Sequence, residues 1–147
     1  VDKFVGDKVM ALFAGSEDPR VDAESALGAA LELQERSAAL NAERTARGMV
    51  PIAIGVGINT GEVVLGNVGS EERMNFTAIG DAVNVADRLQ SLAAPGETLI
   101  GETTARLVEP SFTLVARGPT PIKGRSRVEE VFAVEAISQG VAGQRGE

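Results

Sequence analysis

The sequence contains no cysteine and no histidine among its 147 residues. The missing cysteines exclude disulfide bonds, thiolate nucleophiles and sulfur-ligated metals, and they fit a reducing, cytoplasmic environment. The missing histidines remove the usual general base near neutral pH and the usual zinc ligand. A metal ion in this protein would therefore be held by carboxylate and carbonyl oxygens, which favours magnesium or manganese.

Tryptophan and tyrosine are also absent, and aromatic residues make up only 3% of the chain. A hydrophobic fraction of 44% still provides a real core for one domain. No apolar run approaches the ~18 residues of a membrane span, so any membrane attachment would come from regions outside this chain. The net charge of −7, without a basic stripe or aromatic platform, argues against nucleic acid as a partner. The same charge leaves a mononucleotide possible, because a few placed cations and a metal ion can offset negative charge locally.

Residues 76–89 predict a short strand, a Gly-Asp turn and a helix that begins at once. Asp81 stands where the helix N-cap is expected. Asn84 and Arg88 are four residues apart and therefore leave the same face of this helix. An amide and a guanidinium there are suited to sugar or phosphate oxygens. The alternative is that Arg88 is solvated or paired with a nearby acid.

Two hairpins are predicted in the first half of the chain. Residues 1–13 alternate around Gly6-Asp7, which predicts two strands joined by a tight turn. Asp7 at the tip is either ordinary turn chemistry or a metal ligand. Residues 52–67 predict the second hairpin, with its turn at Asn59-Thr60-Gly61. Its glycines do not match the dinucleotide-binding fingerprint, because no helix follows them directly.

The remaining elements are predicted from their end signals and periodicity. A long helix without an assigned chemical role begins after Asp18 and stops at Gly48. The loop 118–125 places Lys123 and a second cation beside a glycine, which suits either a triphosphate contact or a solvated turn. Further elements are expected as a strand at 98–100, a short helix at 103–108 and an antiparallel pair at 112–116 and 128–134.

The stretches 1–13, 54–66 and 76–89, in this order and at these separations, resemble the catalytic domain of class III nucleotidyl cyclases. The resemblance runs from Val1 to about Val134. It implies an α+β fold, a ferredoxin-like or palm-type antiparallel sheet with helices on one face, here lacking the first strand and helix. It also implies a catalytic domain over residues 1–135 and close backbone packing of the glycines in 54–66 at a dimer surface. The small and polar residues at the end of the chain predict a flexible tail or linker over 136–147.

The resemblance further implies the chemistry. Class III cyclases convert a nucleoside triphosphate to its 3′,5′-cyclic monophosphate and pyrophosphate with two magnesium or manganese ions, in intracellular signalling. Asp7 matches the second of the two metal-binding aspartates, and the first is expected upstream of this chain. Asn84 matches the asparagine that orients the ribose, and Arg88 matches the arginine that stabilises charge on the α-phosphate in the transition state.

The same resemblance assigns substrate-binding residues. Lys3 and Thr77 match the two purine-selecting positions, and Lys123 is the candidate for the β- and γ-phosphates. A lysine donates hydrogen bonds and accepts none, so Lys3 suits adenine and opposes the donor edge of guanine. ATP is therefore the expected substrate, with a guanylate cyclase as an alternative.

In this family the site is shared between two protomers, so we expect a homodimer. Asp7 of one chain would face Lys3, Thr77, Asn84 and Arg88 of the other. Because the first metal aspartate is expected upstream, residues 1–147 alone are expected to have little or no activity. The alternative from another class is a non-catalytic dimerisation or regulatory module with the same fold.

Overall fold

The computed structural model describes residues 1, 3–70, 73–122 and 128–137. Nowhere in these ranges is there a helix of the length and apolar character that crossing a membrane requires. Along the chain the elements are β1 (Lys3–Val5), β2 (Lys8–Met10), α1 (Pro19–Ala46), β3 (Val56–Ile58), β4 (Val64–Ser70), β5 (Arg73–Ile79), α2 (Asp81–Leu92), β6 (Thr98–Gly101), α3 (Glu102–Val108), β7 (Phe112–Pro121) and β8 (Val128–Ile137).

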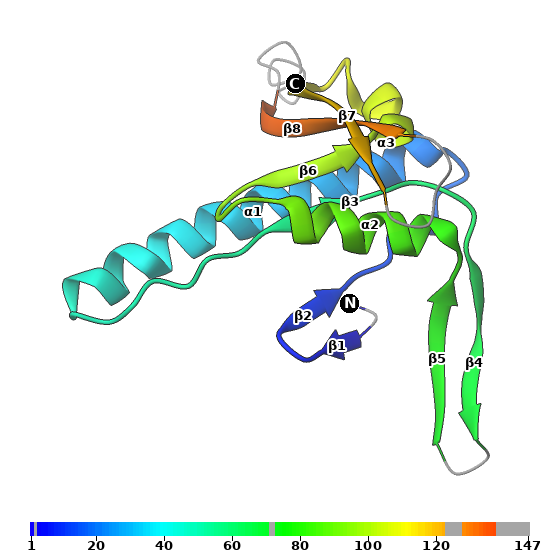
Figure 1. Ribbon diagram of the computed structural model, residues 1–147, viewed down its shortest axis with the longest axis horizontal. Coiled ribbons are helices and arrows are strands. Elements are labelled where there is room, and N and C mark those ends of the chain that lie inside the picture. The colour runs from blue at the N-terminus through cyan, green and yellow to red at the C-terminus, as the bar shows by residue number, and fades with distance from the viewer. Residues whose placement is uncertain (2, 71–72, 123–127, 138–147) are drawn as a thin grey trace, which may run out of the picture.

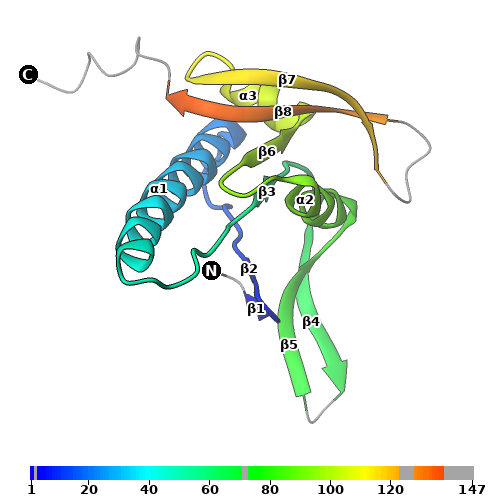
Figure 2. The ribbon, with the colours of Figure 1, turned by 60° about the vertical axis from the view of Figure 1, so that its left-hand side comes forward.

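The centre of the fold is a four-stranded sheet in the order β3-β6-β8-β7. Successive side chains on a strand point to opposite faces, so Leu99 and Ile100 of β6 enter different clusters. Ile100 packs with Leu27 of α1 and with residues of α3, whereas Leu99 packs with Val85 and Leu89 of α2. The sheet therefore lies between α1 and α3 on one face and α2 on the other (Figure 2).

The predicted α+β class is confirmed, and two details differ from the expectation. The sheet is mixed, because β3 and β6 run parallel while the other neighbours are antiparallel. The helices do not all share one face, because the apolar stripe of α2 covers the face opposite α1. Alternating strand residues on β6 and β8 make both faces apolar, and each face therefore needs a helix to cover it.

Helix α1 begins and ends where its end signals predicted. The Asp18 carboxylate accepts the Arg20 backbone N–H at 2.9 Å, and Gly48 adopts a φ of +71° just beyond the helix. The second half of α1 projects from the rest of the molecule (Figure 1). The returning chain is held along it by Asn41, whose side chain donates to Ile52 O and accepts from Ile52 N, each at 2.7 Å.

The first predicted hairpin is confirmed and the second is wrong. β1 and β2 pair antiparallel across a two-residue turn at Gly6-Asp7, with Gly6 at a φ of +61°. β4 does not return to β3: it pairs with β5, and the β4–β5 arm extends away from the sheet (Figure 1). The predicted turn is instead a link held to two helices. The Asn59 amide donates to Ala82 O at 3.2 Å, and the Thr60 and Thr104 hydroxyls lie 2.8 Å apart.

The C-terminal antiparallel pair is confirmed and is longer than predicted. β7 continues to Pro121, so the first part of the predicted loop 118–125 is strand. Lys123 lies outside the described residues, and no placement is assigned to it. β8 continues to Ile137, two residues into the predicted tail 136–147, and residues 138–147 likewise fall outside the description.

Candidate active site

The position of α2 is fixed by glycines of the preceding segment. A Cβ atom on Gly57 would lie 2.2 Å from the backbone nitrogen of Gln90 and 2.4 Å from the carbonyl oxygen of Ala86. A Cβ atom on Gly61 would lie 2.7 Å from the Cβ of Ala82. The backbone of α2 therefore lies directly against β3 and the link that follows it. For Gly57 and Gly61 the structure shows close packing within one chain. The expected use of these glycines at a dimer surface stays a prediction.

The start of α2 differs by one residue from the prediction. The N-cap is Gly80, with no side-chain hydrogen bond at the cap, and Asp81 is the first helical residue. Gly80 adopts a φ of +156°, and a Cβ atom there would lie 3.0 Å from the carbonyl oxygen of Glu62. This close approach favours glycine at position 80, which is the N-cap. The first helical residue is therefore Asp81, which had been predicted as the cap.

The polar face of α2 carries the two residues predicted from their spacing. Val85 and Leu89 are buried against the sheet, and Asn84 and Arg88 are therefore directed away from it and are exposed. Neither side chain forms a hydrogen bond or ion pair with any other described residue. The alternative that Arg88 is neutralised by an acid of its own chain is thus not observed within the described ranges. An amide and a guanidinium are available together on one surface.

The Gly6-Asp7 hairpin lies beside this helix. The Lys8 ammonium donates to the Asp87 carboxylate at 2.9 Å, and Asp87 directly precedes Arg88. Asp7 is exposed at the turn and has no ion-pair partner among the residues described. The Lys8–Asp87 pair is not predicted from the sequence, because its members are 79 positions apart. The one hint of this pair in the sequence is its position, because Lys8 directly follows Asp7 and Asp87 directly precedes Arg88.

The two purine-selecting candidates lie on strands next to this surface. Lys3 is half-buried on β1, opposite Met10. Thr77 lies on β5 opposite Gly66, close to the point where this strand leads into α2. Five of the six candidate residues therefore lie on α2, on the β1–β2 hairpin beside it or on strand β5 that leads into it. The sixth, Lys123, is outside the described residues.

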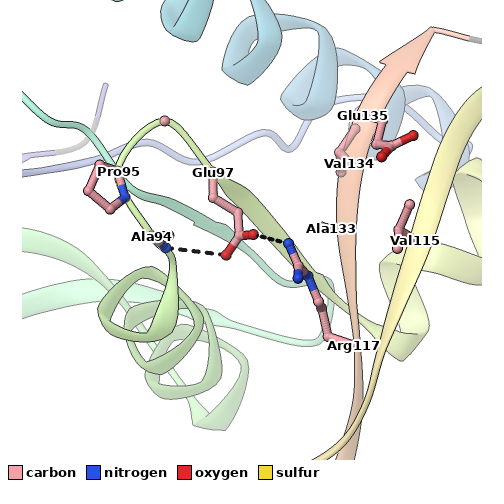
Figure 3. Close-up of a pocket in the computed structure, with 9 residues that line it drawn as sticks. Ala94, Pro95, Glu97, Val115, Arg117, Ala133, Val134 and Glu135 are labelled. Carbon is pink, nitrogen blue, oxygen red and sulfur yellow. Dashed lines mark hydrogen bonds and ion pairs between the residues drawn. The ribbon is translucent and has the colours of Figure 1, made fainter.

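The candidate residues line neither of two hollows found in the described part of the chain. One hollow of about 430 Å³ lies at the C-terminal end of α2 between the following loop and strands β7 and β8 (Figure 3). Glu97 crosses it, accepting the Ala94 N–H at 3.2 Å and pairing with Arg117. A second hollow of about 270 Å³ lies between α3 and strands β7 and β8, lined among others by Glu102 and Phe132. The candidate set instead occupies an open surface.

Asp7 fits one ligand position of a magnesium or manganese ion, because it is an exposed carboxylate without a competing cation on a tight turn. Within the described ranges no three acidic side chains come together as a metal site. A complete site of the kind implied by the resemblance would therefore need ligands in addition to those that surround Asp7 here.

Comparison with known proteins identifies the family. The sequence model of the family named adenylate and guanylate cyclase catalytic domain matches residues 3–135 of this chain. The chain belongs to this class III cyclase family. This cyclase domain is 36% identical over 145 residues to an adenylate cyclase of Anabaena cylindrica, covering 92% of the chain and 28% of that protein. It is 33% identical over 141 residues to adenylate cyclase 1 of Rhizobium meliloti, covering 95% of the chain and 21% of that protein. The cyclase domain thus spans about a quarter of the length of these relatives.

Solved structures support the same assignment. The cyclase domain resembles the adenylyl cyclase CyaB from P. aeruginosa with a TM-score of 0.88 and 33% identity, over 94% of this chain and 72% of that chain. It resembles the guanylyl cyclase Cya2 with a TM-score of 0.83 and 31% identity, over 95% of this chain and 71% of that one. Similar backbones therefore occur in cyclases named for different purines, and substrate choice has to be argued from side chains.

Proposed function

We propose that this cyclase domain forms 3′,5′-cyclic AMP and pyrophosphate from ATP in intracellular signalling, at two composite sites of a homodimer. The observation that supports the shared site is the open, polar face of α2. Asn84 and Arg88 are exposed and unpaired within the described chain, and they line neither of the two hollows described above. A second copy that brings Asp7 opposite this face would complete a site with both a carboxylate and a guanidinium.

Each residue has a role that follows from its chemistry. Asn84 orients the ribose through its amide, which both donates and accepts hydrogen bonds. The Arg88 guanidinium stabilises the charge that develops on the α-phosphate during the transfer. Asp7 holds the metal ions, and magnesium or manganese there would lower the pKa of the ribose 3′-hydroxyl and neutralise phosphate charge. The chain needs no histidine for this chemistry.

The composite site is tested by mixing two inactive variants. Asp7→Ala removes the carboxylate of one half-site and Arg88→Ala removes the guanidinium of the other. In an equal mixture half of the dimers are heterodimers, and each of these retains one intact site of two. In a form of the protein extended at the N-terminus, the mixture should therefore recover about a quarter of wild-type cyclic AMP formation, whereas a site built within one chain would recover nothing.

The choice of ATP depends on Lys3 and Thr77. Exchanging Lys3→Glu together with Thr77→Cys replaces a donor by an acceptor at the purine edge, which should shift preference toward GTP. Relative kcat/KM values of the N-terminally extended protein for ATP and GTP measure the shift. Unchanged selectivity for ATP in the double variant would overturn this assignment of the purine positions.

We also propose that residues 1–147 alone have little or no activity, since the first metal-binding aspartate is expected N-terminal to Lys3. The test compares the 147-residue chain with an N-terminally extended form, measuring cyclic AMP and cyclic GMP with manganese. Activity that appears only in the extended form is the expected result. Robust, metal-dependent activity of the 147-residue chain would contradict it. An extended form that dimerises but makes neither product would favour the non-catalytic module.

A further inference from the structure

The first turn of α2, which carries Asn84, is contacted by the link between β3 and β4. The N-cap of the helix is Gly80, which has no side chain to accept an N–H of that turn. The side-chain amide of Asn59 reaches the turn from the link and donates to the carbonyl oxygen of Ala82 at 3.2 Å. Two residues further along the link, a Cβ atom on Gly61 would lie 2.7 Å from the Cβ of Ala82. The link therefore touches a polar and an apolar group of the residue two positions before Asn84.

The link is itself anchored to the core of the domain. Thr104 of α3 is completely buried, and its hydroxyl lies 2.8 Å from the Thr60 hydroxyl. The Asn59 side chain lies against Gly101, where an added Cβ atom would come within 2.6 Å of the Asn59 Oδ1. Glycine at position 101 thus leaves the space that the amide occupies. These contacts join β3, α2, β6 and α3 of one protomer, the same protomer that contributes Asn84 to the composite site.

We propose that Asn59 is a positioning residue that fixes Asn84 for the ribose. Ala82 and Asn84 lie in one helical turn, so a shift of the Ala82 carbonyl moves the Asn84 side chain with it. The reaction needs the 3′-hydroxyl in line with the α-phosphate, and its rate falls steeply when a positioning group is displaced. The catalytic consequence rests on the proposed cyclase function. Asn59 acts through Asn84 and does not touch the nucleotide.

The seating of the first turn can be measured without nucleotide. In the helix, Ala82 O also accepts the N–H of Ala86, which exchanges with solvent when the first turn opens. Asn59→Asp keeps the shape of the side chain but removes the donor, and Asn59→Ala removes the whole amide. Loss of one such hydrogen bond shifts a local equilibrium about five-fold. In the N-terminally extended protein, amide exchange at Ala86 should therefore become about five-fold faster in both variants, with exchange at Leu89 unchanged.

Ser111→Ala is the matched control. It also removes one partly buried side-chain hydrogen bond, which the Ser111 hydroxyl donates to the Glu24 carboxylate at 2.7 Å. This bond joins α1 to the turn before β7, and α1 covers the face of the sheet opposite α2. The control should change neither the exchange of Ala86 nor kcat.

A double-mutant cycle separates positioning from a general loss of folded protein. Asn59→Asp should lower kcat for cyclic AMP formation by the extended protein by up to about five-fold, the factor by which the seated arrangement is weakened. In an Asn84→Ala background the same substitution should change kcat by less than about two-fold, because the side chain that Asn59 positions is gone. A general loss of stability would lower kcat equally in both backgrounds.

The two measurements test separate parts of the inference. Exchange at Ala86 that stays unchanged in both Asn59 variants refutes the hold on the first turn. A loss of kcat that is equal with and without the Asn84 side chain refutes the positioning role, and so does an unchanged kcat. If the extended protein makes no cyclic nucleotide even as wild type, the proposed function fails, and exchange at Ala86 still decides whether Asn59 seats the start of α2.

Discussion

Replacing Gly57 by alanine tests how closely α2 lies against β3. The added Cβ would lie 2.2 Å from Gln90 N, 2.4 Å from Ala86 O and 2.8 Å from the carbonyl carbon of Leu89. All three are backbone atoms of one helix, so no side-chain rotation can relieve the overlap. Ordinary contact begins near 3.4 Å, and the strand and helix must therefore separate by about 1 Å.

The cost follows from what this separation does to the core. Val85 and Leu89 are completely buried between α2 and the sheet, and a gap of 0.5–1 Å forfeits roughly a quarter to a half of each dispersion contact. Overpacking costs typically 1–3 kcal/mol, and the backbone overlap here places Gly57→Ala at about 3 kcal/mol. For a chain of this size the melting temperature should fall by roughly 6–12 °C.

Urea and thermal unfolding followed by far-UV circular dichroism provide the measurement. Tryptophan and tyrosine are absent, so intrinsic fluorescence is not a useful probe. Gly28→Ala on α1 is the matched control, because its added Cβ meets nothing within 4 Å. Removing a mid-helix glycine should raise stability by about 0.5–1 kcal/mol. If Gly57→Ala were as stable as wild type while Gly28→Ala gained stability, the direct contact between β3 and α2 would be refuted.

Two further substitutions probe single contacts, and a third probes the proposed role of Arg88. Asp18→Ala should cost about 1 kcal/mol in urea unfolding, because the Arg20 N–H loses its acceptor at the N-cap. Asn41→Ala should cost about 1 kcal/mol locally, because Ile52 loses two hydrogen bonds of 2.7 Å, and amide exchange at Ile52 should become about five-fold faster. If the proposed function holds, Arg88→Lys should lower kcat of the extended protein by about 10²–10³-fold with little change in KM, because an ammonium cannot reproduce the guanidinium fork.

Features governed by local rules could be predicted from the sequence. The limits of α1 follow from Asp18 and Gly48, and the first hairpin follows from Gly6-Asp7, because caps and tight turns depend on residues that are neighbours in the chain. The exposure of Asn84 and Arg88 follows from helical spacing, because burying Val85 and Leu89 directs the adjacent face outward.

Features that depend on distant partners could not be predicted in this way. Residues 52–58 alternate as a hairpin strand would, but β3 finds its partner in β6, about forty residues later. The role of Gly57 depends on a helix packed over it, and spacing within the strand carries no sign of that helix. The Lys8–Asp87 pair depends on how the hairpin and α2 meet in space, which no periodicity encodes.

The contacts of α2 give the candidate site one firmly fixed part. Asn84 and Arg88 stand on a helix whose backbone is seated against β3 so closely that a single methyl group does not fit. Val85 and Leu89 of the same helix are buried against the sheet. Weakly packed segments open at little cost in free energy, whereas core elements do not. Helix α2 should therefore be protected from amide exchange before any ligand binds. Adding manganese and nucleotide to the N-terminally extended protein should change amide exchange at Val85 and Leu89 little.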